Sequence, residues 1–176
     1  MIWRLMLSAD EKLLLAVRRL ESRVMTRLML FLTALGEPST WAFVGLALAF
    51  SGAQGPRQCL LLVGGAVVAL SASQTLKRLC CRKRPSSGIW GFAALVENPD
   101  AFSFPSGHTS VAFAVAISLS GEGSGLGALV LVLALGIAVS RVYLGAHYPL
   151  DVAAGVLVGT LSGALAKGVV GQAWLL

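Results

Sequence analysis

The two histidines of this chain each stand in a short polar motif at the border of an apolar run. His108 ends the motif Pro105-Ser106-Gly107-His108, and His147 follows Ser140-Arg141 and precedes Asp151. A carboxylate that accepts a hydrogen bond from one ring nitrogen fixes the imidazole tautomer and leaves the other nitrogen free to attack. Asp151 lies four residues after His147, across the expected start of a helix, so it can fold back on that ring. The pattern predicts phosphoryl transfer through a phosphohistidine.

The surroundings of the two histidines give them different roles. His147 has Asp151 close by, whereas His108 has no acidic residue nearby in the sequence. We therefore expect His147 to be the nucleophile, Asp151 to orient it, and His108 to protonate the departing alcohol as a general acid. Taken singly, each has an ordinary explanation: a histidine as a polar side chain at the membrane interface, and Asp151 as an acid that stabilises a helix start. Their conjunction favours a catalytic site.

Basic residues accompany both histidines. Lys77 and Arg84 close one apolar run, and Arg141 ends a later one. A phosphate monoester carries nearly two negative charges, spread over oxygens that fixed cations and backbone N–H groups can bind. Ser106 adds a hydroxyl donor at a helix N-terminus, and Gly107 lets the backbone approach an anion closely. We expect five phosphate-binding residues: Lys77, Arg84, Ser106, Gly107 and Arg141.

The composition places these motifs in a membrane protein. Of the 176 residues, 56% are hydrophobic and 12% are charged, and the mean hydropathy is +0.80, which is too apolar for a soluble domain. The net charge is +6, but the basic residues flank apolar segments, which favours anionic lipid headgroups and a phosphate substrate over nucleic acid. The three cysteines show neither a disulfide framework nor metal-ligand spacing. We expect no metal and no cofactor, and a lipid phosphate and the bilayer as partners.

Five apolar runs separated by turn-forming residues predict an all-α, polytopic membrane bundle of about five spanning helices. They cover residues 39–53, 58–76, 107–120, 126–144 and 150–174. The amino-terminal segment differs, because its apolar residues recur every three or four positions and four arginines lie off that stripe: Arg18, Arg19, Arg23 and Arg27. Within a single domain of residues 1–176, we expect residues 1–36 to form one interfacial amphipathic helix and residues 37–176 a transmembrane catalytic core. Alternatively, the apolar end of this helix, residues 28–35, enters the membrane and the helix breaks at Gly36-Glu37-Pro38.

Following the chain through these spans brings the motifs to one membrane face. Lys77 ends the second run, His108 begins the third, and Arg141 ends the fourth. Most of the 14 Lys and Arg residues lie on this side or in the amino-terminal segment, and some are typical of positive-inside anchors: Arg78, Arg82 and Lys83. The charge bias, together with the unpaired Cys80 and Cys81, predicts that the site of this cell-membrane protein faces the cytoplasm.

The motifs also resemble a known family. Lys77-x6-Arg84-Pro85, Pro105-Ser106-Gly107-His108 and Ser140-Arg141-x5-His147-x3-Asp151 are similar to the three signatures of the type 2 phosphatidic acid phosphatase (PAP2) superfamily, complete at every signature position. The resemblance implies a helical core like that of vanadium haloperoxidases and a metal-independent phosphatase acting on a lipid phosphate or pyrophosphate. It also implies the roles given above to the two histidines and Asp151.

Two other functions stay open at this point. A vanadate-dependent oxidoreductase would use the same kind of pocket, although the vanadium haloperoxidases are soluble, and a non-catalytic membrane protein would retain the fold, although the motifs are intact. The sequence does not distinguish phosphatidate, phosphatidylglycerophosphate and polyprenyl phosphates as substrates, nor does it indicate an oligomeric state. Four aromatic residues are expected to form a wall against the lipid chain: Trp90, Phe92, Phe102 and Phe104.

Overall fold

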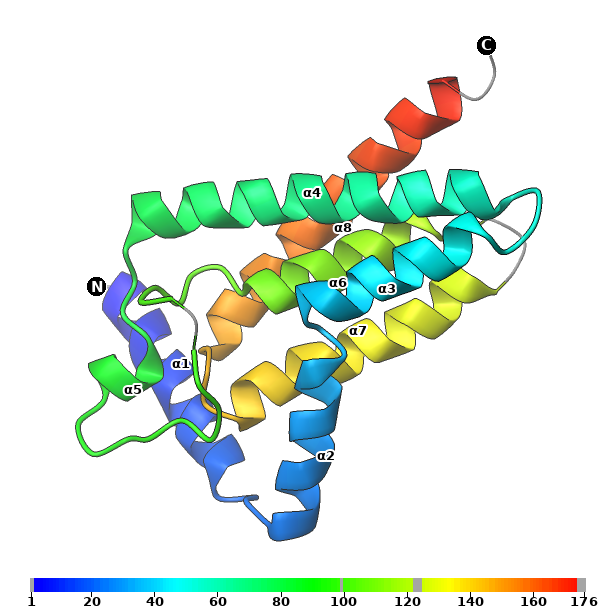
Figure 1. Ribbon diagram of the computed structural model, residues 1–176. Coiled ribbons are helices and arrows are strands. Elements are labelled where there is room, and N and C mark those ends of the chain that lie inside the picture. Colours follow the sequence, from blue (N-terminus) through cyan, green and yellow to red (C-terminus); the bar gives the residue numbers. More distant parts are fainter. Residues whose placement is uncertain (1, 99, 122–124, 174–176) are drawn as a thin grey trace.

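The computed structural model describes residues 2–98, 100–121 and 125–173, with side chains from residue 7 onward. This part of the chain consists of helices and connecting loops, as expected for an all-α fold (Figure 1). The helices are α1 (Ile2–Arg18), α2 (Arg23–Ala34), α3 (Pro38–Ala49), α4 (Gly55–Cys80), α5 (Pro85–Gly88), α6 (Gly107–Ser118), α7 (Leu126–Tyr143) and α8 (Pro149–Ala173).

The five apolar runs correspond to α3, α4, α6, α7 and α8. Within the described residues, α4, α7 and α8 are long and apolar enough to cross a membrane, with 26, 18 and 25 residues. The helices α3 and α6 have 12 residues each, so each is about 18 Å long and shorter than the hydrocarbon core of a bilayer. The end of the last predicted run, residue 174, lies outside the described residues.

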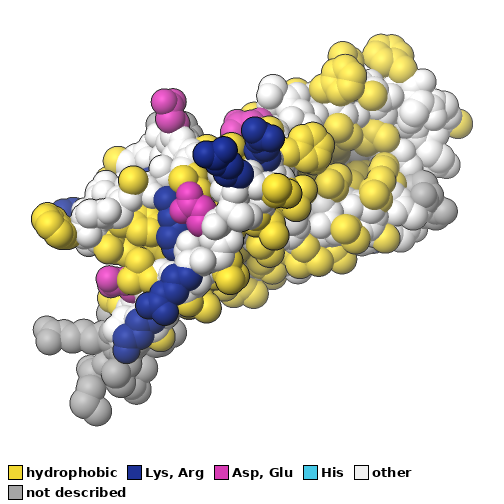
Figure 2. All heavy atoms as spheres, turned by 90° about the horizontal axis from the view of Figure 1, so that it is seen from below, with side chains coloured by type: hydrophobic (Ala, Val, Ile, Leu, Met, Phe, Trp, Pro, Cys, Tyr) yellow, Lys and Arg dark blue, Asp and Glu magenta, His cyan; other side chains and the backbone are white. Residues whose placement is uncertain are grey.

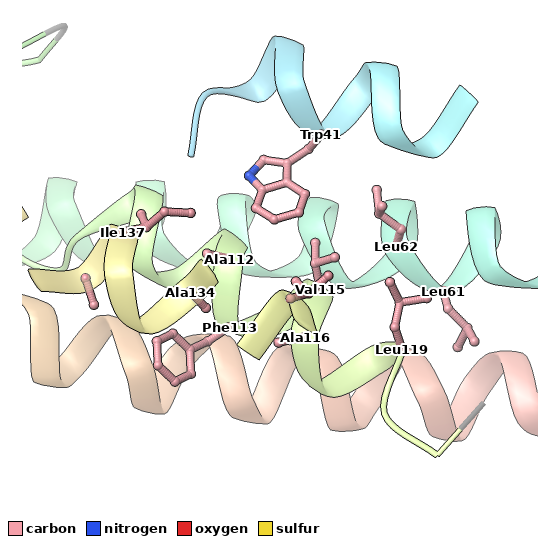
Figure 3. Packing of buried hydrophobic residues seen from close by; sticks show 12 residues of the cluster. Trp41, Leu61, Leu62, Ala112, Phe113, Val115, Ala116, Leu119, Ala134 and Ile137 are labelled. Carbon is pink, nitrogen blue, oxygen red and sulfur yellow. The ribbon is translucent and has the colours of Figure 1, made fainter. Parts of the chain in front are cut away.

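Helix α6 lies at the centre of the bundle, in contact with α4, α7 and α8. Figure 3 shows its side chains between α4, α7 and α3, with Phe113 and Val115 on α6 and Trp41 reaching in from α3. On α8, three glycines at four-residue spacing face the backbone of α6: Gly155, Gly159 and Gly163. A Cβ at any of them would clash with α6, so these glycines let the two helices pack closely.

The outward faces of the long helices are apolar. Large aliphatic side chains recur there with high exposure, among them Val132 on α7 and Leu161 on α8 at 68% and 71%. Several small polar residues point inward instead, including Ser110 and Ser140. Exposed apolar bands of this kind are unfavourable in water and suit lipid contact. In the face drawn in Figure 2, Lys and Arg side chains gather over one half of the molecule and the other half is largely apolar.

The amino-terminal segment forms two helices, so the prediction of one continuous amphipathic helix was wrong. Helix α1 ends in a tightened turn, where Leu20 N–H bonds to Val17 O, three residues back. Ser22 then caps α2, and its Oγ accepts a hydrogen bond from the Met25 N–H at 3.3 Å. The Ser22 N–H also donates to Tyr143 Oη at 3.1 Å, which fixes the break against the end of α7.

The helix ends that carry the motifs lie together. In Figure 1, the C-terminal ends of α4 and α7 and the N-terminal ends of α6 and α8 are at the same end of the bundle, beside α1, α2 and α5. The C-terminal end of α8 projects from the opposite end. The fold therefore brings residues that are far apart in the sequence to a single site.

Candidate active site

A pocket of about 390 Å³ opens at this end of the bundle. Its polar part is lined by six of the eight candidate residues: Lys77, Arg84, Gly107, His108, Arg141 and His147. The other two, Ser106 and Asp151, are both 0% exposed and lie behind the lining. Of the eight, therefore, six face the space that a substrate would occupy and two support them.

Three cations form the floor of the pocket. Lys77 lies in the last turn of α4, Arg141 in the last turn of α7, and Arg84 immediately before α5. All three are buried, at 5%, 2% and 3% exposure. Arg141 donates through Nη1 to Thr33 Oγ1 on α2 at 2.5 Å, while its buried Nε has no partner in the described part of the chain. A buried, unsatisfied guanidinium N–H is unfavourable by itself and suits an incoming anion.

A carboxylate already lies on two of these cations. Asp100 accepts from Lys77 Nζ at 2.5 Å and from Arg84 Nη2 at 2.6 Å, and its backbone oxygen accepts from Arg84 Nε at 2.8 Å. Burial alone would raise the pKa of Asp100, but the bonds from Lys77 and Arg84 outweigh it and hold that pKa below its ordinary value. The charged carboxylate therefore stands where phosphate oxygens would bind.

The contacts of His147 fix one tautomer. Its Nδ1 lies 2.7 Å from Ser103 O, which can only accept a hydrogen bond, so Nδ1 carries the proton. Its Nε2 lies 3.3 Å from Arg84 Nη1, which can only donate, so Nε2 presents its lone pair. Burial, followed by the nearby Arg141, Arg84 and Lys77, lowers the pKa of His147 well below its usual range. The ring is therefore neutral, with Nε2 available as a nucleophile at neutral pH.

The position of Asp151 differs from the simple expectation that it bonds directly to the ring. Its Oδ2 is 3.8 Å from His147 Nδ1, and the Ser103 carbonyl is the nearer acceptor. Asp151 instead accepts from the Tyr148 N–H at 2.9 Å, and its backbone oxygen accepts from the Ser106 N–H at 2.9 Å. It therefore fixes the turn after His147 and ties that turn to the start of α6.

The two residues at the start of α6 are arranged differently from each other. Ser106 directs its hydroxyl to Thr109 Oγ1 at 2.9 Å, so in this state it is bound within α6 rather than presented to the pocket. Gly107 lines the pocket, and a Cβ there would meet no atom within 4 Å. Because that side of the backbone is open, the N-terminal end of α6 is accessible to an anion.

His108 has an acidic partner that its sequence neighbourhood did not reveal. Its Nε2 lies 3.1 Å from Glu37 Oε1, in the residue just before α3. Both residues line the pocket. A carboxylate beside an imidazole stabilises its protonated form. Burial, followed by the charge of Arg141, nevertheless lowers the pKa of His108 to about 4 although Glu37 raises it, so the ring is neutral until an anion binds beside it.

The pocket continues as an apolar groove between α3 and α4. Its lining there includes Trp41 on α3 and, on α4, Leu62, Ala66, Val67 and Leu70. The expected aromatic wall is elsewhere: none of the four loop aromatics is among the described lining residues, and Trp90 is 101% exposed. The prediction failed because apolar side chains on two facing helices, not the loop, provide the surface beside the cations.

Several residues of the site had no local sequence signal. Ser103 acts through its backbone carbonyl, which any residue carries. Asp100 and Glu37 are acidic residues in loops, without motif spacing. Arg82 was grouped with membrane anchors, yet its side chain binds Asp151 at 2.6 Å. The position of Arg82 two residues before the Arg84-Pro85 motif was the available hint. No group of three or more His, Cys, Asp or Glu side chains suited to a metal occurs among the described residues.

Comparison with known proteins gives a consistent result. The family model of the PAP2 superfamily matches residues 58–174. The chain is 38% identical over 131 residues to the decaprenylphosphoryl-5-phosphoribose phosphatase of Mycobacterium tuberculosis, covering 74% of this chain and 72% of the relative.

Two solved structures share the fold. The crystal structure of Aquifex aeolicus LpxE superposes with a TM-score of 0.78 at 25% identity, covering 88% of this chain and 92% of the other. The PAP2-type phosphatidylglycerolphosphate phosphatase from Bacillus subtilis gives 0.75 at 28% identity, covering 95% and 87%. With its apolar spanning helices, this chain is a multi-pass membrane protein, and it belongs to the PAP2 superfamily.

Proposed function

We propose that this protein hydrolyses the phosphate ester of a membrane lipid through a phosphohistidine on His147. The observation that carries the proposal is the neutral Nε2 of a buried histidine beside three buried cations, in a pocket that continues as an apolar groove. The cations suit the phosphate and the groove suits a lipid chain. A soluble phosphate ester would not need the groove.

In the first step, the lipid phosphate displaces Asp100 from Lys77 and Arg84. These two cations and Arg141 bind its non-bridging oxygens and stabilise the charge that builds up during transfer. His147 Nε2 attacks phosphorus, a P–N bond forms, and the P–O bond to the lipid breaks. His108 gives its proton to the leaving oxygen, so the lipid departs as a neutral alcohol.

In the second step, water replaces the lipid alcohol. His108, now unprotonated, takes a proton from that water as its oxygen attacks phosphorus. The P–N bond breaks and inorganic phosphate forms, which restores the neutral His147. The Ser103 carbonyl keeps the proton on Nδ1 throughout, so the same nitrogen attacks and leaves.

The chemical class of the substrate is a lipid carrying a terminal phosphate or pyrophosphate. Apart from Gln74, the groove lining between α3 and α4 consists of Trp41 and aliphatic side chains, which suits an acyl or polyprenyl chain. The similarity to a decaprenylphosphoryl-5-phosphoribose phosphatase makes polyprenyl-linked phosphates the first candidates. Phosphatidate and phosphatidylglycerophosphate complete the set to be compared.

The test is phosphate release by the purified protein in detergent across a panel of these lipid phosphates. We expect turnover of at least one of them and loss of turnover in His147→Ala. Rapid-quench samples of the unaltered protein should contain an acid-labile phosphoenzyme, and those of His147→Ala should not. Cys59→Ser, at the far end of α4, serves as the control variant. Substantial activity in His147→Ala, or phosphate trapped on His108, would contradict the assignment.

We further propose that the site faces the cytoplasm, because basic residues are concentrated at its end of the bundle. Cys80 and Cys81 are exposed at this end. In intact cells, a membrane-impermeant thiol reagent should leave them unlabelled. A variant with both changed to Ser and with Gln54→Cys, in the exposed turn at the opposite end of α4, should be labelled readily. The reverse pattern would place the site on the outer face.

A further inference from the structure

Behind the pocket, the partly buried side chain of Arg82 joins two buried carboxylates in a chain of ion pairs. Arg82 donates through Nη2 to Asp10 Oδ2 and through Nη1 to Asp151 Oδ1, both at 2.6 Å. The side chains of Asp10 and Asp151 are 1% and 0% exposed. Asp10 comes from α1, Arg82 follows α4, and Asp151 lies in the first turn of α8. The cluster therefore joins the amino-terminal helix to the helix that begins after His147.

Arg82 also holds the group that fixes the His147 tautomer. Its backbone oxygen accepts from the Ser103 N–H at 2.8 Å, and the Ser103 carbonyl accepts from His147 Nδ1 at 2.7 Å. The Arg82 guanidinium also lies over the Tyr148 ring, with Cζ 4.1 Å from the ring centroid. Arg82 therefore contacts both residues beside His147, Ser103 through its backbone oxygen and Asp151 through its side chain, although it does not line the pocket.

Asp10 extends this support to the start of α8. Its Oδ1 accepts from the Leu150 N–H at 2.8 Å, while Asp151 Oδ2 accepts from the Tyr148 N–H at 2.9 Å. The first N–H groups of a helix have no partner within the helix, and α1 supplies an acceptor for one of them. The two carboxylates thus bind the backbone of the residues that directly follow His147.

We propose that Arg82 and Asp10 are positioning residues for His147, which makes α1 part of the catalytic unit. The inference rests on the proposed phosphohistidine mechanism, because it concerns the placement of the attacking Nε2. Without the Arg82 side chain, two buried carboxylates face each other with no cation, so the turn after His147 must rearrange. A misplacement of about 1 Å can slow the chemical step by about 100-fold. The phosphate-binding cations stay in place.

The first test separates kcat from KM in the purified full-length protein. We expect Arg82→Gln to lower kcat by about 10- to 100-fold while KM changes by less than about threefold. Arg82→Lys should recover part of the rate, because an ammonium keeps the charge but lacks the fork that reaches both carboxylates. Asp10→Asn should lower kcat by a smaller factor, since Arg82 stays bound to Asp151. The exposed neighbours serve as matched controls: Lys83→Gln and Glu11→Gln.

The second test uses two inhibitors with different demands on His147. Vanadate forms a bond to Nε2 and needs the ring in its attacking position, whereas inorganic phosphate needs only the cations. We expect the vanadate inhibition constant of Arg82→Gln to rise by the same factor as kcat falls, with the phosphate constant unchanged. Equal weakening of both inhibitors, or a kcat equal to that of the unaltered protein, would overturn the positioning role.

A third variant keeps this inference distinct from the proposed function. If His147→Ala retains turnover, the phosphohistidine mechanism itself is wrong. If His147→Ala is inactive while Arg82→Gln and Asp10→Asn work normally, the mechanism stands and only the positioning role is refuted. Because Asp10→Asn is nearly isosteric and leaves the Arg82–Asp151 pair intact, it tests the link to α1 even if Arg82→Gln folds poorly.

Discussion

Asp100 should compete with phosphate for the cations of the pocket, and its replacement should tighten phosphate binding. In the present state its two carboxylate oxygens bind Lys77 and Arg84 at 2.5 and 2.6 Å, so a substrate must first displace them. The bond from Arg84 Nε to the Asp100 backbone oxygen does not depend on the side chain. Asp100→Asn therefore removes the competing charge and keeps the main loop contact.

The size of the effect follows from the two contacts. A hydrogen bond between charged groups contributes about 1.5–3 kcal/mol when buried, and an exposed ion pair about 0–1 kcal/mol. The Asp100 side chain is 32% exposed and its partners are nearly buried, so about 1 kcal/mol for each contact is reasonable between these limits. Because 1.4 kcal/mol corresponds to a factor of ten, the phosphate inhibition constant should fall roughly 10- to 30-fold.

The assay measures competitive inhibition by inorganic phosphate at several pH values. The control variant is Glu97→Gln, because Glu97 is an exposed residue of the same loop. The pKa of Asp100 is held below its ordinary value, so its charge and its competition disappear only as the pH falls below that lowered value. The difference between the variant and the unaltered protein should therefore be constant from pH 8 to about 5. An unchanged or weaker phosphate affinity in Asp100→Asn would refute the competition.

Three other predictions concern the histidines and metal ions. In the first turnover, before the phosphoenzyme is hydrolysed, His108→Ala should slow release of a lipid alcohol by roughly 10²- to 10⁴-fold but slow release of nitrophenol from nitrophenyl phosphate much less, because that leaving group needs no proton; equal losses in this first turnover would exclude a general acid. The pKa of His147 is lowered in the fold, so acid protonates this histidine in the unfolded chain first. The free energy of unfolding should therefore decrease below about pH 6.5, and the decrease should be smaller in His147→Gln. Activity should survive EDTA, since three cations already neutralise the phosphate; loss restored by magnesium would contradict this.

The sequence predicted the helices of the core well because their signal is local. Each apolar run is bounded by turn-forming residues, and α4, α7 and α8 begin and end within a few residues of the expected limits. The break between α1 and α2 was missed, because the apolar periodicity continues across it. What interrupts the helix is the contact of the Ser22 backbone with Tyr143, a residue distant in sequence.

The site was predicted only as far as its motifs reach. The spacing of Lys77, Arg141 and His147 relative to the apolar runs was enough to place them at one end of the bundle. The sequence distance between histidines and acids, which assigned the nucleophile, leaves out contacts made only in the fold. In three dimensions His108 has Glu37 beside it, and the tautomer of His147 is fixed by the Ser103 carbonyl rather than by Asp151. The assignment of His147 now rests on its neutral, donor-facing Nε2.

The charges of the pocket explain why a carboxylate that slows binding would be retained. Three buried cations around a neutral histidine are unfavourable without a counterion. During turnover the counterion is the substrate phosphate, which carries nearly two negative charges. Without substrate, the protein itself must supply the counterion. Asp100 fits this role because it is partly exposed and lies in a loop, so it can leave when substrate enters and return as phosphate departs. On this view Asp100→Asn gains phosphate affinity and loses stability of the empty state, and both follow from the same two ion pairs.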